Sequence, residues 1–139
     1  MDMNINNFIW PVRVYYEDTD AGGVVYHSNY LNFMERARTE WLRALGFEQT
    51  EVKEEFGVII VVHSLSINYK RPAKFNDKLE VHCALAAYGR SSLEMAQRIT
   101  CHGVELAQAH IKAAFVDAAT FRPTAIPEQI KQTMAKLKP

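Results

Sequence analysis

The chain has 139 residues, of which 48% are hydrophobic and 23% charged, and this composition predicts one globular domain over residues 1–139. Sixteen basic residues balance sixteen acidic ones, which disfavours a nucleic-acid partner or a polybasic membrane anchor. The N-terminus lacks the pattern of a signal peptide, the longest apolar run (58–62) is too short to span a bilayer, and there are two cysteines. A cytoplasmic protein without a transmembrane segment is therefore expected.

The first expected element is a strand over residues 10–16, where apolar and polar side chains alternate. A turn-rich break follows at residues 17–23. A long amphipathic helix is then expected, with Ser28 or Asn29 as its cap and Gly46 as its stop signal. It is predicted from apolar residues that recur at spacings of three and four: Tyr30, Met34, Ala37, Trp41 and Leu45.

Alternating or β-branched segments predict four more strands, and Pro127 suits the first turn of a short C-terminal helix. The strands are expected at residues 58–69, 78–85, 93–101 and 107–115. Consecutive strands with segregated helices predict an α+β fold, in which a five-stranded antiparallel sheet wraps one long helix. Long free sheet edges predict oligomerisation by edge pairing.

The densest group of reactive side chains lies in the connection between the first strand and the long helix. It carries Glu17, Asp18, Asp20 and His27 around a pair of glycines. A helix N-terminus offers unpaired N–H groups and a positive dipole end, where a developing oxyanion can be stabilised. The same residue types are also ordinary turn formers, so composition alone leaves both interpretations open.

No metal or cofactor signature accompanies this connection, so none is expected. Asp18, Asp20 and Gly23 fit an EF-hand loop, but Gly22 and Asn29 stand where two further ligands are needed. The histidines are scattered, neither cysteine belongs to a close ligand pair, and phosphate-loop and dinucleotide fingerprints are missing. Basic residues at 70–74 and 89–92 are candidates for phosphate contacts or for solvated turns.

Residues 12–27 (VRVYYEDTDAGGVVYH) are followed by Asn29-Tyr30 and by ERARTE at 35–40. This pattern strongly resembles the hotdog-fold acyl-CoA thioesterases of the 4-hydroxybenzoyl-CoA thioesterase family. Its nearest branch looks like the thioesterase encoded with the bacterial Tol–Pal envelope system. The resemblance implies a hotdog fold, active sites at a dimer interface, and a homo-oligomer, either a dimer or a homotetramer.

The resemblance also implies roles for individual residues. Asp20 matches the aspartate that acts as nucleophile or general base on the thioester, and His27 matches the helix-start residue whose backbone N–H polarises the thioester carbonyl. The aromatic-acyl branch has proline at the position of Ala21 and tyrosine at that of His27, so this chain falls outside that branch. Asp18 is expected to be structural. The expected substrate contacts are Tyr26, Arg71, Arg90 and Ser91.

The leading hypothesis is therefore an acyl-CoA thioesterase that releases free acid and coenzyme A, with thioesters of acyl carrier protein as further substrates. A thioester is already activated, so a carboxylate, a carbonyl-polarising donor and an acyl pocket suffice for its hydrolysis. Two alternatives remain open. One is a hotdog thioester dehydratase, and the other is a non-catalytic subunit that binds acyl carrier protein or acts as a scaffold.

Overall fold

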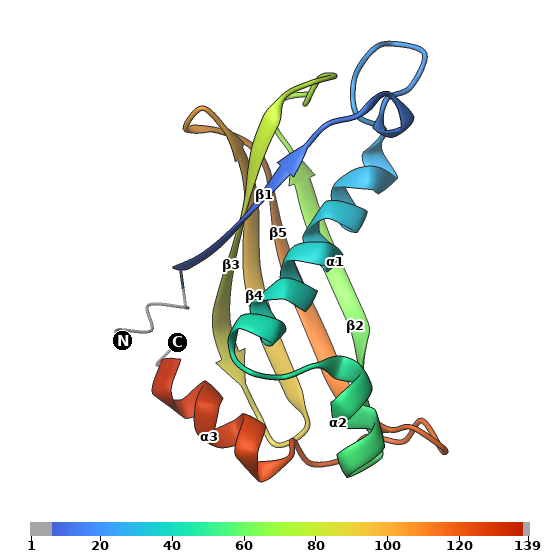
Figure 1. Ribbon diagram of the computed structural model, residues 1–139, viewed down its shortest axis with the longest axis vertical. Helices are drawn as coiled ribbons and strands as arrows, with labels where there is room; N and C mark the ends of the chain where they lie inside the picture. Colours follow the sequence, from blue (N-terminus) through green and yellow to red (C-terminus); the bar gives the residue numbers. More distant parts are fainter. Residues whose placement is uncertain (1–6, 138–139) are drawn as a thin grey trace.

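The computed structural model describes residues 7–137 and contains one five-stranded antiparallel sheet with the strand order β1-β3-β4-β5-β2 (Figure 1). The central pairings place Ile99 opposite both Val81 and Ala107. This architecture confirms the predicted α+β class and all five expected strands. The strands are β1 (Phe8–Arg13), β2 (Val58–Tyr69), β3 (Lys78–Tyr88), β4 (Ser92–Cys101) and β5 (Val104–Asp117).

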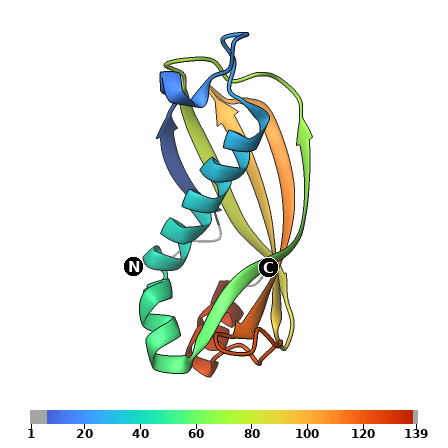
Figure 2. The ribbon, with the colours of Figure 1, turned by 90° about the vertical axis from the view of Figure 1, so that its right-hand side faces the viewer.

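The predicted long helix is α1 (His27–Ala44), which crosses one face of the sheet. Figure 2 shows α1 on one side of the curved sheet, whereas no described helix covers the opposite face. The apolar stripe predicted from periodicity supplies much of the buried surface of the helix. Its buried residues are Tyr30, Phe33, Met34, Ala37, Trp41 and Leu42.

The prediction that Ser28 or Asn29 caps this helix is wrong. Helix α1 begins at His27, with Tyr26 at the N-cap position and no side-chain cap. Contacts outside the helix fix this start, because the Tyr26 N–H donates to the Asp18 carbonyl (3.0 Å). The Asn29 amide donates to the Asp18 carboxylate (3.1 Å) rather than to the helix backbone.

The first strand is also shorter than its alternating sequence suggests, since β1 ends at Arg13. The Tyr15 N–H donates to the Asp18 carboxylate at 2.8 Å, and this bond holds a short 3₁₀ turn, η2 (Tyr16–Asp18). A local side-chain bond therefore competes successfully with continuation of the strand.

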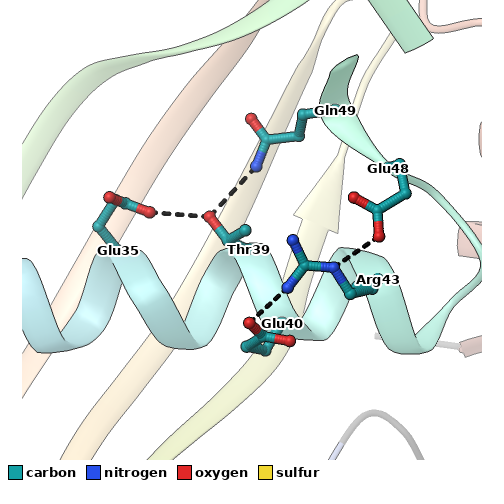
Figure 3. A network of polar contacts seen from close by, with 6 residues as sticks. All are labelled: Glu35, Thr39, Glu40, Arg43, Glu48 and Gln49. Atoms are coloured by element: carbon teal, nitrogen blue, oxygen red, sulfur yellow. Dashed lines mark hydrogen bonds and ion pairs between the residues drawn. The ribbon is translucent and has the colours of Figure 1, made fainter. Parts of the chain in front are cut away.

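Helix α2 (Gln49–Phe56) was not predicted, whereas α3 (Glu128–Leu137) follows Pro127 as expected. Polar contacts join α2 to α1 (Figure 3). The Gln49 amide donates to the Thr39 hydroxyl (3.2 Å), and Arg43 bridges Glu40 and Glu48. Within residues 7–137, no helix is long and apolar enough to cross a membrane.

Candidate active site

The connection between η2 and α1 folds into a small hairpin at the end of the sheet where α1 begins (Figure 1). Thr19 pairs with Val25, and the Asp20 N–H donates to the Val24 carbonyl at 2.9 Å. The N–H of Gly23, a residue with a φ of 79°, donates back to the Asp20 carbonyl at 3.0 Å. Asp20 is therefore held by backbone bonds on both of its sides.

The side chains of Asp18 and Asp20 have different surroundings. Both carboxylate oxygens of Asp18 accept hydrogen bonds, from the Tyr15 N–H and from Asn29. Asp20 is exposed, and one of its oxygens accepts the Gly22 N–H at 2.8 Å. Among the described residues no other hydrogen bond reaches the Asp20 carboxylate, so its second oxygen is available for chemistry.

The start of α1, which follows this loop in the chain, provides a free donor. Residues 7–137 offer no hydrogen-bond acceptor to the His27 N–H, and Tyr26 supplies no side-chain cap to the N–H groups that follow. The His27 carbonyl accepts the Tyr69 hydroxyl at 3.1 Å, and the two rings lie 4.7 Å apart. A backbone N–H at a positive helix end can stabilise negative charge that develops on a bound carbonyl.

Two tyrosines support the helix start in a way that the sequence pattern does not reveal. Tyr30 is buried, its hydroxyl accepts the Ala73 N–H at 2.9 Å, and burial raises its pKa. Its ring packs edge-on against Tyr69, with the ring centres 5.1 Å apart. Periodicity assigned Tyr30 to the core and Tyr69 to a strand. The available signal was the position of Tyr69 at the end of its strand, next to the basic segment 70–74.

The structure brings some of the predicted site residues together and separates others. A shallow pocket of about 210 Å³ includes His27 and Arg71 in its wall, and the exposed Tyr26 directly precedes His27. Arg90 and Ser91 lie in the turn between β3 and β4, at the other end of the sheet (Figure 1). One chain alone therefore does not gather all the expected substrate contacts.

Replacing Tyr30 with phenylalanine is expected to lower the free energy of unfolding by about 1–3 kcal/mol, because the buried Ala73 N–H loses its acceptor. Urea denaturation at a fixed protein concentration measures this loss. Tyr16→Phe is the matched control, since the Tyr16 side chain is exposed. Equal stability of the wild type and Tyr30→Phe would show that this hydroxyl does not hold the segment.

Comparisons with known proteins identify the family of this chain. Residues 14–134 match the family described as the thioesterase-like superfamily. The "Acyl-CoA thioesterase YbgC" of Haemophilus influenzae is 44% identical over 133 residues, covering 96% of this chain and 98% of that protein. The "Acyl-CoA thioester hydrolase YbgC" of Escherichia coli O6:H1 is 43% identical, with coverage of 92% and 96%.

A solved structure extends the agreement to the fold. The "Probable Thioesterase from Bartonella henselae" superposes with a TM-score of 0.84 at 32% identity, covering 87% of this chain and 99% of that one. The five-stranded sheet around α1 is thus the hotdog fold expected from the resemblance. The chain is therefore a member of the thioesterase-like superfamily.

Proposed function

We propose that the chain is an acyl-CoA thioesterase that uses Asp20 and the backbone N–H of His27. The observation that carries this proposal is an exposed carboxylate, fixed by backbone bonds, in the loop that leads into a helix start without a side-chain cap. Relatives named as acyl-CoA thioesterases match nearly the whole chain and support the same reaction.

In the proposed reaction, either water or the Asp20 carboxylate adds to the thioester carbonyl carbon, and the carbon–sulfur bond then breaks. The oxyanion formed in this addition accepts a hydrogen bond from the His27 N–H. Asp20 either takes a proton from the attacking water or attacks the carbonyl itself, forming an anhydride that water cleaves. Both routes end in a free acid and the thiol of coenzyme A. The ring of His27 packs against Tyr69, and we propose that it helps to orient Asp20 or the water.

We further propose that two copies pair through the free edge of β2, and that two such dimers form a tetramer. Strand β2 has 12 residues and only one neighbour, β5. Large apolar side chains remain exposed in the single chain, including Val62 on this edge and Tyr16 and Tyr26 near the site. Burial of such surface drives association.

Pairing through β2 also explains how the expected substrate contacts, which lie at opposite ends of the sheet in one chain, can come together. Antiparallel pairing of two β2 strands about a two-fold axis brings opposite ends of the two sheets to the same end of the dimer. Arg90 and Ser91 of the partner subunit then lie at the same end as Tyr26 and Arg71. We propose these four residues as coenzyme A contacts in a cytoplasmic enzyme.

A thiol-release assay tests the proposed function. A panel of acyl-CoAs, from short aliphatic to long-chain and aromatic, should include at least one that the purified chain hydrolyses. Release from no member of the panel would contradict the proposal. Hydrolysis restricted to thioesters of acyl carrier protein would identify a different thioesterase substrate.

Replacing Gly23 with alanine is expected to reduce thiol release as well as stability. A side chain at a φ of 79° costs about 1–2 kcal/mol, and relief of that strain moves the backbone that holds Asp20. Gly57→Ala is the matched control, because Gly57 has a φ of 66° at the far end of α2. Both variants should lose similar stability in urea, but only Gly23→Ala should lose activity. Equal activities of the two variants would show that catalysis does not depend on the backbone conformation at Gly23.

A further inference from the structure

A cavity of about 290 Å³ lies between α1 and the inner face of the sheet, away from Asp20. Most of its wall is apolar and includes Trp41, Leu42, Ile60 and Met95. Arg38 is a charged residue in the same wall. An apolar cavity that contains a guanidinium group suits a ligand with an apolar stem and a negative end.

Arg38 is held in place by a buried glutamine. Its guanidinium donates to the Gln97 side-chain oxygen at 2.9 Å, and Gln97 is only 2% exposed. The Gln97 amide nitrogen donates to the Met34 carbonyl (3.0 Å) and lies 2.9 Å from the Cys83 sulfur. Because its nitrogen is used in these contacts, the Gln97 oxygen must face Arg38. The guanidinium is thus positioned before any ligand arrives.

The positive charge of Arg38 is poorly compensated within one chain. Among residues 7–137, Gln97 is its one hydrogen-bond acceptor, and no carboxylate lies within ion-pair distance. Burial lowers the pKa of Arg38, although the nearby Glu35 carboxylate opposes this shift. Glu35 also lines the cavity, but it is exposed and accepts the Thr39 hydroxyl at 2.7 Å (Figure 3). A guanidinium with free N–H groups matches a carboxylate in both charge and geometry.

Trp41 is another residue of this wall, and it carries a donor without a partner among residues 7–137. The Trp41 indole N–H is buried and has no hydrogen-bond acceptor in the described part of the chain. Buried donors of this kind usually have a partner. The free N–H groups of Arg38 are donors, so the ligand group that pairs with them is an acceptor.

The position of the cavity indicates which site it serves. Arg38 lies eleven residues after His27, about 16 Å along the helix, which exceeds the length of a short acyl chain. Tyr69 at one end of β2 is bonded to His27, whereas Ile60 and Val62 of the cavity wall lie toward the other end. In the β2-paired dimer proposed above, the cavity of one subunit would therefore lie toward the same end as the helix start of its partner.

We infer, on the basis of the proposed thioesterase function, that this cavity receives the acyl chain of a substrate held at the partner's Asp20, and that Arg38 binds a carboxylate at the end of that chain. The substrate class is thus the monothioesters of dicarboxylic acids. The methylene groups of the acyl chain contact the apolar wall, and its terminal carboxylate accepts hydrogen bonds from the free N–H groups of Arg38.

Matched substrate pairs test the inference: succinyl- with butyryl-CoA, glutaryl- with pentanoyl-CoA, and adipyl- with hexanoyl-CoA. A charged hydrogen bond of this kind corresponds to about a 10–100-fold preference in kcat/KM for the carboxylate member of at least one pair. Arg38→Met should remove the preference, measured as the ratio of the two kcat/KM values within each pair. Arg38→Lys, which keeps the charge without the planar fork, should be intermediate. Arg36→Met changes an exposed arginine of the same helix and should leave the preference intact.

Equal kcat/KM within every pair, or an equal loss for both members in Arg38→Met, would overturn the inference. Dissociation of Arg38→Met with an unchanged preference would overturn it too, because Arg38 would then bind a carboxylate of the second copy. If the wild type hydrolyses no thioester, the proposed function fails. Calorimetric binding of adipyl- and hexanoyl-CoA to the Asp20→Asn variant then tests the Arg38 site separately, and equal affinities would reject it.

Mixed subunits test whether Arg38 serves the partner's site. Arg38→Met chains are refolded with an excess of Asp20→Asn chains, so that most Arg38→Met chains have an Asp20→Asn partner. In such a mixed dimer, the one Asp20 comes from the Arg38→Met chain and the one Arg38 comes from the Asp20→Asn chain. Recovery of the carboxylate preference supports the arrangement across the interface. Activity without that preference would place Arg38 in the site of its own chain and overturn the proposed geometry.

Discussion

Replacing Asp20 with asparagine is expected to reduce thiol release from acyl-CoA by about 10²–10⁴-fold, the usual contribution of a positioned acid–base group. The side-chain oxygen of asparagine can still accept the Gly22 N–H, which Asp20 accepts at 2.8 Å, so the loop should keep its conformation. Asparagine neither takes a proton from water nor attacks a thioester at neutral pH. The measurement is kcat/KM on the best substrate of the acyl-CoA panel, with urea denaturation to confirm that the fold is retained.

Glu17→Gln is the matched control for this prediction. Glu17 is an exposed carboxylate in the same connection, so its replacement removes the same charge without touching Asp20. We expect its activity to stay within a few-fold of the wild type, since exposed charges are strongly screened. Unchanged turnover by Asp20→Asn would exclude the proposed role of Asp20.

Replacing Phe33 with alanine should cause the largest loss of stability among the variants considered, about 3–5 kcal/mol. Phe33 is 1% exposed and lies on the face of α1 that packs against the sheet, so truncation leaves a cavity at the centre of the core. The free energy of unfolding in urea, measured at a fixed protein concentration because association affects it, checks this value. Phe121→Ala, at a residue that is 66% exposed, should change stability by less than about 1 kcal/mol. Similar losses in both variants would contradict the central role of α1.

The elements with a long repeating pattern could be predicted from the sequence. The spacing of Tyr30, Met34, Ala37 and Trp41 identified the helix, and these residues are buried in the structure. Helix α2 was missed because it has eight residues and buries only Val52, which is too little for a periodic pattern. Some helix and strand boundaries are set by contacts between residues that are distant in the sequence, and these boundaries have no local sequence signature. An example is the bond from the Val25 N–H to the Ala73 carbonyl, just before α1.

The candidate site was predictable in part, for a similar reason. Asp20 and His27 belong to one continuous segment, so the sequence placed them close together. Arg90 and Ser91 were assigned to the same site, but β3 begins opposite Arg13 near Asp20 and ends at Tyr88, beyond which these two residues lie. Counting strand directions could have revealed this separation, because each hairpin in an antiparallel sheet reverses the chain. The contact between Arg38 and Gln97 joins residues 59 positions apart, and no local pattern indicates it.

The cysteine beside Gln97 has a consequence for chemical durability. Burial raises the pKa of the Cys83 thiol to about 12, and the side chain is 1% exposed. The thiolate is the form that attacks peroxides and disulfide reagents, so this sulfur offers almost no reactive species at neutral pH. Oxidation of Cys83 to a bulky, charged acid would break the packing under α1 and the Gln97 contacts. Cys83 should therefore resist mild oxidants as long as the protein stays folded, and lose that resistance when it unfolds.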